Sequence, residues 1–192
     1  MDWDTSYHIN VTEIEGIDLK ATYRKDFAFG DFRINTNHRW TTSNKSGLFS
    51  DNELIESAGD IGEPMYVSNT QFQFERKDFT YAWTVDVIGQ TNQTTFNNGV
   101  NPIVSLPGSY YAFNGVARVL YKTKTETTIT HDASVQYRSD NWTLVGGVSN
   151  LFDERPPAIS TGVFFSRLGN TPLVSQYDLI GRSVFASVTR RF

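Results

Sequence analysis

Apolar residues recur at every second position in segment after segment of this 192-residue chain. A period of two is typical of β-strands whose faces meet different surroundings, whereas an amphipathic helix has a period of 3.6. From Ile17 to Arg24, for example, the odd positions are apolar or aromatic and the even positions carry Asp, Lys, Thr and Arg. The sequence therefore predicts an all-β fold, with about seven strands at residues 16–24, 32–41, 66–75, 80–87, 129–137, 142–149 and 183–192.

Two kinds of connection alternate between these strands. Structureless loops beyond about 12–15 residues are uncommon in soluble domains, whereas outer-membrane barrels combine short turns on one side with long loops on the other. The pattern favours an antiparallel meander that forms part of the wall of a transmembrane β-barrel. The short connections are residues 25–30, 76–78 and 138–141, and the long ones are about 43–64, 91–122 and 153–176.

Aromatic residues make up 14% of the chain and collect near the two ends of the predicted strands. Rings prefer the headgroup level of a bilayer, so two belts that flank an apolar band fit a lipid-facing wall. Periodicity alone leaves a soluble β-sandwich open, because a sandwich also has alternating faces and rim aromatics. The belt at the short turns comprises Tyr23, Phe27, Phe29, Phe32, Phe74, Phe79, Tyr81, Tyr137, Trp142 and Phe192, and the other comprises Trp40, Tyr66, Phe152 and Tyr177.

Charge and composition exclude several classes of function. The formal net charge of −4 gives no basic footprint for a nucleic acid partner. The chain has no cysteine, which removes disulfides, thiolate zinc sites and cysteine nucleophiles. Three histidines form no metal motif, and Ser160 and Ser166 lack the G-x-S-x-G context of a nucleophile. We therefore predict no catalytic residue, metal or cofactor, and no nucleic acid partner.

The charged residues have explanations that do not require catalysis. Asp86 and Asp132 lie on the predicted polar face, and His38 and His131 fall on the face assigned to lipid. We expect the two aspartates to form charge pairs in a barrel lumen with Lys20, Arg24, Arg33 and Arg39. The loop carboxylates match no calcium-loop spacing and are interpreted as a solvated acidic loop; they are Asp51, Glu53, Glu56, Asp60 and Glu63.

Several motifs near the end of the chain carry a family resemblance. The run Asn-Leu-Phe-Asp-Glu-Arg-Pro-Pro at 150–157, the Gly-Arg-Ser step at 181–183 and the terminal Phe192 resemble the C-terminal end of a TonB-dependent outer-membrane receptor. Residues 131–137 and 15–19 also resemble that family's pattern. Arg190 departs from it, because the last strand there commonly has an outward tyrosine or another apolar residue. Either Arg190 lies near the membrane interface or the face assignment shifts at that position.

The resemblance implies a plugged transporter barrel, a class with 22 strands. Such a barrel needs about 220 residues in strands alone, at about 9–11 residues per membrane strand. We therefore interpret residues 1–192 as one unit, the C-terminal segment of the receptor barrel. The plug, the energy-coupling segment and a signal peptide would lie upstream of Met1.

The implied function is energised uptake of a siderophore, a vitamin or an oligosaccharide across the outer membrane of a Gram-negative bacterium, without enzymatic activity. The implied partners are outer-membrane lipid, the barrel-assembly machinery through the last strand, and the TonB complex only through the missing N-terminal region. Tyr137, Trp142 and Phe192 are predicted as membrane-girdle residues, with Phe192 also part of the assembly signal. The loop aromatics predicted to contact substrate are Phe49, Phe96, Tyr110, Tyr111, Phe164 and Phe165.

Two alternatives remain open from the sequence. One is a soluble β-sandwich that binds carbohydrate through its loop aromatics. The other is a complete outer-membrane barrel of eight strands, with the eighth strand hidden in residues 110–121.

Overall fold

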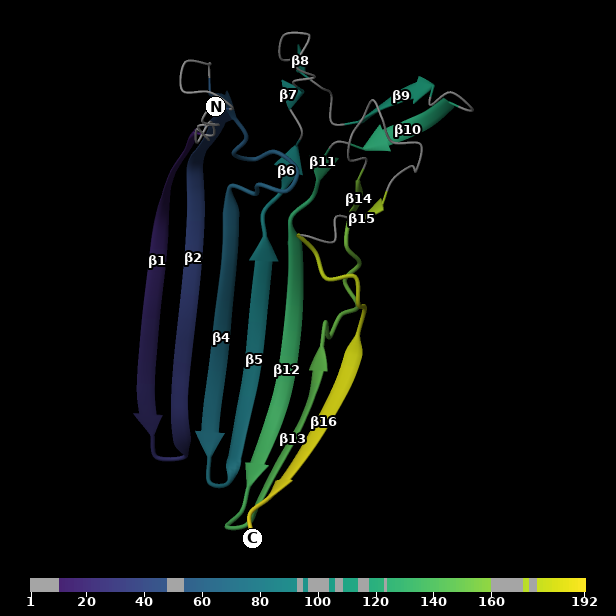
Figure 1. Cartoon of the computed structure of the whole chain (residues 1–192). Coiled ribbons are helices and arrows are strands. Elements are labelled where there is room, and N and C mark those ends of the chain that lie inside the picture. The colour runs from purple at the N-terminus through teal and green to yellow at the C-terminus, as the bar shows by residue number, and fades with distance from the viewer. Residues whose placement is uncertain are drawn as a thin grey trace, which may run out of the picture.

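The computed structural model describes most of the chain, and every regular element in the described part is a β-strand. Its largest element is one antiparallel sheet, to which β-strands from both halves of the chain contribute (Figure 1). The described residues are 11–47, 54–92, 95–96, 104–105, 109–113, 118–122, 124–159, 171–172 and 176–192.

Seven long strands form the sheet in the order in which they occur in the sequence. Every neighbouring pair is antiparallel. The two-residue strand β3 (Ile55–Glu56) pairs with residues 45–46 of β2 (Gly30–Gly47). The predicted all-β fold and the meander of about seven strands are confirmed. The seven strands are β1 (Val11–Phe27), β2 (Gly30–Gly47), β4 (Tyr66–Arg76), β5 (Phe79–Ile88), β12 (Thr128–Arg138), β13 (Trp142–Ser149) and β16 (Ser183–Arg190).

The short and long connections lie at opposite ends of the sheet, as Figure 1 shows. The turns at residues 28–29, 77–78 and 139–141 lie at one end, which we call the short-turn end. The other end, the long-loop end, carries four two-stranded ladders that lie off the main sheet. They are β6 (Thr91–Asn92) with β11 (Lys124–Thr125), β7 (Thr95–Phe96) with β8 (Val104–Ser105), β9 (Ser109–Phe113) with β10 (Arg118–Lys122), and β14 (Ala158–Ile159) with β15 (Thr171–Pro172).

The eighth strand sought at residues 110–121 does not join the main sheet. Within this segment β9 and β10 pair with each other, from Ser109 opposite Lys122 to Phe113 opposite Arg118. Because β9 and β10 hydrogen-bond to each other, this segment adds no strand to the main sheet. Strands β5 and β12, which flank the segment in the sequence, pair directly with each other. The eight-stranded alternative is therefore wrong about this segment.

The register of the ladders determines which residues share a face, because directly opposed residues point to the same side. Leu19 lies opposite His38, His38 opposite Ser68, Ser68 opposite Val87, and Val87 opposite Ile129. The predicted apolar sets of all seven strands thus lie on one side. We call this side the apolar face and the other the polar face; the apolar face comprises odd residues of β1 (17–27), β5 and β12, and even residues of β2 (30–40), β4, β13 and β16.

The sheet is a single layer without an apolar core of its own. Among the side chains that the structure describes, 22 large hydrophobic ones are exposed and one, that of Tyr177, is buried. Full burial of a large apolar side chain is worth about 1.5–3 kcal/mol, so a cover over the apolar face would stabilise the sheet substantially. Over the described part of the chain no second sheet covers the apolar face, as the sandwich alternative would require.

Candidate functional site

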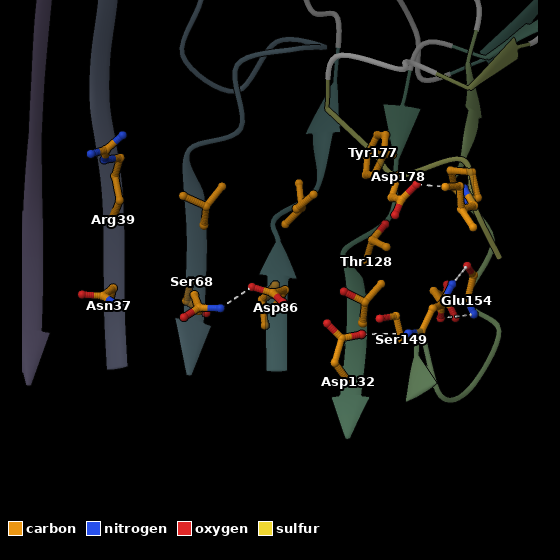
Figure 2. Close-up of a pocket in the computed structure, with 18 of the residues that line it drawn as sticks. Asn37, Arg39, Ser68, Asp86, Thr128, Asp132, Ser149, Glu154, Tyr177 and Asp178 are labelled. Carbon is orange, nitrogen blue, oxygen red and sulfur yellow. Dashed lines mark hydrogen bonds between the residues drawn. The ribbon is translucent and has the colours of Figure 1, made fainter. Parts of the chain in front are cut away.

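A pocket of about 630 Å³ lies against the polar face at the long-loop end. Its floor consists of residues from six strands, β1, β2, β4, β5, β12 and β13, and includes Lys20, Asp86 and Asp132. Its cover is the segment between β15 and β16, residues 176–182, which we call the covering segment. Figure 2 shows Tyr177 and Asp178 of this segment beside Thr128, at the upper end of the pocket. We call this space the polar pocket.

Tyr177 attaches the covering segment to the loops of the long-loop end. Its side chain is only 5% exposed, and its hydroxyl donates to Oγ1 of Thr125 (3.4 Å). The same oxygen of Thr125 accepts the backbone N–H of Thr91 (3.0 Å), while Oε1 of Gln176 accepts the N–H of Gly62 (2.9 Å). Four segments distant in sequence are thereby joined. The prediction of Tyr177 as a belt residue is wrong, because its side chain is buried, with its hydroxyl bonded to Thr125, and is not exposed on the apolar face.

Asn150 organises the turn that leads from β13 into the loop beneath the covering segment. Its side-chain amide bonds twice to the backbone of Glu154, accepting from N and donating to O at 2.8 Å each. Its own N–H donates to Oδ1 of Asp132 (2.8 Å), and the next N–H, that of Leu151, donates to the carbonyl of His131 (2.7 Å). The first residue of the motif at 150–157 therefore connects that turn to β12.

Asp153, the last residue of the Asn-Leu-Phe-Asp run, connects the same turn to the Gly-Arg step. Its Oδ1 accepts the backbone N–H of Arg182 at 2.9 Å. A Cβ atom at Gly181 would lie 2.7 Å from that oxygen, so a glycine there permits the close approach. The segments that carried the family resemblance, around 131, 150–157 and 181–183, thus meet in one hydrogen-bonded unit. Sequence reasoning singled them out as motifs but did not predict this contact.

The polar pocket carries an excess of negative charge. Its lining includes the cations Lys20 and Arg39, and Arg39 forms an exposed ion pair with Asp18 (2.9 Å). The expected charge pairs of Asp86 and Asp132 are not formed; Asp86 accepts from the amide of Asn69 (2.6 Å), and Asp132 from the backbone of Asn150. Neutral donors lie closer to both carboxylates than the arginines do, so the prediction was wrong on this point. The lining carboxylates are Asp18, Asp86, Asp132, Glu154 and Asp178.

The part of the acidic loop that the structure describes is folded against the upper end of β2. Glu56 accepts three hydrogen bonds, from Oγ of Ser43 (2.6 Å) and from the N–H groups of Asn44 (2.7 Å) and Ala58 (2.9 Å). These donors, Ser43 foremost, lower the pKa of Glu56 from its usual 4.5 to about 2. Glu63 accepts from the Asn44 amide (3.1 Å). These two carboxylates therefore hold the loop in place, while Asp51 and Glu53 lie outside the described residues.

A row of rings crosses the apolar face at the short-turn end. Phe27 stacks on Phe29 (5.2 Å between centroids), and Phe79 packs against Tyr137 (5.0 Å). Phe74 and Tyr81 lie between these pairs, with centroid separations of 6.1–6.4 Å along the row. A continuous row of rings thus extends from β1 to β12, with the rings of β4 and β5 in its middle. It lies at the place where the sequence predicted a belt.

The predicted girdle residues Trp142 and Phe192 lie beside Arg190, the position at which the family pattern left two possibilities. Arg190 lies directly opposite Trp142, on the apolar face. Its guanidinium carbon is 5.2 Å from the centroid of Trp142 and 4.9 Å from that of Phe192. The face assignment therefore does not shift, and Arg190 occupies the short-turn margin of the apolar face.

The two histidines of the sheet lie among rings on the apolar face. His38 hydrogen-bonds through Nδ1 to the hydroxyl of Tyr66 (2.9 Å) and through Nε2 to that of Thr36 (2.7 Å). His131 accepts from the indole N–H of Trp83 (3.1 Å). Each imidazole has thus found a partner inside the sheet. Within the described ranges no three His, Asp or Glu side chains gather so that they could hold a metal ion.

The loop aromatics predicted to contact substrate stay predictions. Phe49, Phe164 and Phe165 lie outside the described residues. The structure describes only the backbone of Phe96 in β7, and of Tyr110 and Tyr111 in β9.

The comparisons with known proteins return no relative. No protein-family model, no curated protein and no solved structure matches this chain. Among the described residues, no helix has the length and apolar character needed to cross a membrane.

Proposed function

We propose that this chain is the C-terminal part of the barrel wall of a TonB-dependent outer-membrane receptor, a protein for energised uptake and not an enzyme. In this proposal the apolar face contacts lipid and the polar face lines the lumen of a larger barrel. The long-loop end is extracellular and the short-turn end periplasmic, following the rule for outer-membrane barrels.

The observation that carries the proposal is the amphipathic single layer. A soluble sheet buries its apolar side chains against a second layer, yet here Ile17, Val184 and Val188 are more than 60% exposed. The strands β4, β5 and β12 have 11, 10 and 11 residues, which is the length of a tilted strand that crosses the hydrocarbon of a bilayer. Contact with lipid would stabilise such a face without any second layer.

The number and direction of the strands favour a section of a larger barrel. With seven antiparallel strands, β1 and β16 run in the same direction, so direct pairing of these two edges would be parallel. Antiparallel closure requires an odd number of further strands between them. Until closure, each backbone group left unpaired at an edge within hydrocarbon costs several kcal/mol. We therefore place the remaining strands upstream in the receptor.

The polar pocket is the cargo-facing part of the wall in this proposal. Hydroxyl, amide and carboxylate groups line it, together with the ring of Tyr177 and aliphatic residues such as Val67, Ile88 and Ile180. Five carboxylates against two cations favour a neutral or positively charged cargo over an anionic one. Among siderophores, vitamins and oligosaccharides, we infer uptake of a member that carries hydroxyl or amino groups and no net negative charge.

Solubility and electrophoretic mobility test the membrane assignment. The purified chain should require detergent to remain in solution, because its apolar face has no cover of its own. On a denaturing gel, unboiled and boiled samples should migrate alike, because a sheet with two unpaired edges is not a closed, heat-resistant barrel. A shift on boiling would indicate a complete barrel. A monodisperse monomer in plain buffer would refute the proposal. Independently, the DNA upstream of the Met1 codon should encode a plug and a signal peptide in frame.

A further inference from the structure

Charged side chains are rare on the apolar face, and those present share a sign and a location. Apart from the histidines, the face defined by the ladders carries three charged residues, Lys25, Arg76 and Arg190. All three are cationic, and all lie within two residues of the short-turn end of a strand. The ladders thus define a cationic row along one margin of the apolar face, carried by β1, β4 and β16.

Each cation of this row is exposed and adjoins aromatic residues. Lys25 lies opposite Phe32, Arg76 opposite Phe79, and Arg190 opposite Trp142. Ion pairs that the structure describes involve other residues, so none of the three has a carboxylate partner there.

The carboxylates of the same strand ends lie on the other face. Asp26 lies opposite Asp31, and Asp31 opposite Glu75, all on the polar face. The three cations therefore lie on the apolar side of these strand ends and the three carboxylates on the polar side, with Asp78 and Asp140 in the short turns between strands.

This arrangement matches the chemistry of an anionic membrane surface. A Lys or Arg near the interface keeps its alkyl stem on apolar surface and extends its charged head to the lipid phosphates. Guanidinium groups bind phosphate through two parallel hydrogen bonds, and anionic lipids attract nearby cations. We propose that Lys25, Arg76 and Arg190 bind the phosphate groups of anionic phospholipids in the leaflet at the short-turn end. This inference rests on the proposed function, because it requires the apolar face to lie in a bilayer.

Arg190 has a place for an acyl chain on its own strand. A shallow apolar depression of about 690 Å³ lies farther from the short turns, lined in part by Val135, Gly146 and Ala186. Gly146 lies opposite Ala186, and no atom lies within 4 Å of the position that a Cβ on Gly146 would take. Ala186 is four residues from Arg190, about 13 Å along the strand. A phospholipid with its phosphate at Arg190 can therefore lay one acyl chain in this depression.

Fluorescence quenching by brominated lipids tests the site at Arg190. A variant with Trp3, Trp40 and Trp83 replaced by phenylalanine retains Trp142, the ring beside Arg190, as its only indole. We would place the chain in dodecyl maltoside micelles with brominated phosphatidylglycerol or brominated phosphatidylcholine. Quenching of Trp142 should favour phosphatidylglycerol by about fivefold in apparent affinity, the factor expected for one cation at an anionic surface. R190Q should abolish that preference.

The neighbouring Arg191 provides the matched control. It follows the last residue of β16, and its backbone N–H donates to the carbonyl of Asn141. R191Q removes the same charge one position away and should keep the preference for phosphatidylglycerol. Equal loss in R190Q and R191Q would overturn the site and indicate general attraction to positive charge.

The two levels of the argument fail differently in this experiment. Equal quenching of Trp142 by both lipids, in the single-tryptophan variant that retains Arg190, would overturn the anionic lipid site and leave the proposed function standing. No quenching by either lipid would mean that the apolar face does not contact acyl chains, which would overturn the proposed function together with this inference.

Discussion

The two faces of the sheet satisfy their polar groups in different ways. On the apolar face Thr70, Thr36, His38 and Tyr66 form one chain of hydrogen bonds of 2.7–2.9 Å, all within the sheet. On the polar face, the hydrogen bond from Asn69 to Asp86 (2.6 Å) and the ion pair of Asp18 with Arg39 join exposed side chains. Surface pairs of this kind contribute little, because water competes for both groups.

Under the proposed function, the difference follows from the solvent that each face contacts. Polar groups in an apolar surrounding must find partners inside the protein, since an unpaired group costs much there. Polar groups in water have no such requirement. The histidines, which looked out of place on an apolar face, fit this rule because both ring nitrogens of His38 and Nδ1 of His131 form hydrogen bonds, with Tyr66, Thr36 and Trp83. The faces therefore respond differently to the same substitution, and matched pairs of variants can measure that difference.

A charge in the middle of the apolar face should give the largest effect. Val135 is 41% exposed, so V135R would be almost neutral if this face met water. If it meets hydrocarbon, the arginine should destabilise the chain in lipid micelles by about 2–4 kcal/mol. Q136R places the same side chain at the next residue, on the polar face, and should change the free energy of unfolding by less than about 0.5 kcal/mol.

Denaturant titration in mixed micelles, followed by tryptophan fluorescence, measures both variants of this pair. Equal effects of V135R and Q136R would remove the distinction between the faces. A smaller loss for V135R than for Q136R would reverse the assignment of lipid and water to them.

Adjacent glycines of β13 provide a second pair, based on packing. A methyl group on Gly147 would lie 2.7 Å from ring carbon Cε1 of Phe185 and 2.8 Å from the carbonyl of Ala133, on the polar face. G147A should therefore cost about 1–3 kcal/mol by overpacking. At Gly146 the same methyl meets no atom within 4 Å, so G146A should be neutral or slightly stabilising.

The double variant G147A/F185A sharpens the result of the glycine pair. It removes the contact with the Phe185 ring but keeps the contact with the Ala133 carbonyl. Adding G147A to F185A should therefore cost less free energy of unfolding than adding G147A to the wild type, but the cost should not vanish. Unfolding free energies in micelles decide this. Equal costs of G146A and G147A would contradict the close packing of Phe185 over β13.

The sequence predicts the sheet well because its signal is local. Alternation assigns both face and strand for each of the seven segments, and the short turns pin their register. The same rule places Arg190 on the apolar face, although its charge alone argues against that assignment.

The site is less predictable because its contacts join segments far apart in the chain. Tyr177 binds Thr125 across 52 residues, and Arg182 binds Asp153 across 29. Periodicity carries no signal for such pairs, and for this reason the sequence predicts a belt position for Tyr177 and a lumen charge pair for Asp132. Motif resemblance did point to Asn150 and Asp153, but not to their partners.

Removing the Asn150 amide should weaken the polar face at its loop end by a moderate amount. N150A loses both hydrogen bonds to Glu154 and puts alanine at a φ of 51°, where a Cβ is unfavourable. Together these should cost about 1–2 kcal/mol. N150G tolerates the same φ and loses only the amide, so it should cost less. Faster hydrogen exchange at the Leu151 and Arg182 amides would report the loosened turn, and unchanged exchange in N150A would contradict its role.

The smallest effect concerns Glu56, which tests whether carboxylate hydrogen bonds hold a loop where no apolar face is available. Its folded pKa of about 2 lies below the usual 4.5, so the charged form is the one that the fold favours. The resulting stabilisation is complete above pH 4.5, declines between pH 4.5 and 2, and is absent below pH 2. The amide chemical shifts of Asn44 and Ala58, which both donate to Oε1, should therefore titrate with a midpoint near pH 2. E56Q should abolish this titration. A wild-type midpoint at pH 4.5 would show that the three donors do not hydrogen-bond to the Glu56 carboxylate when the protein is in solution.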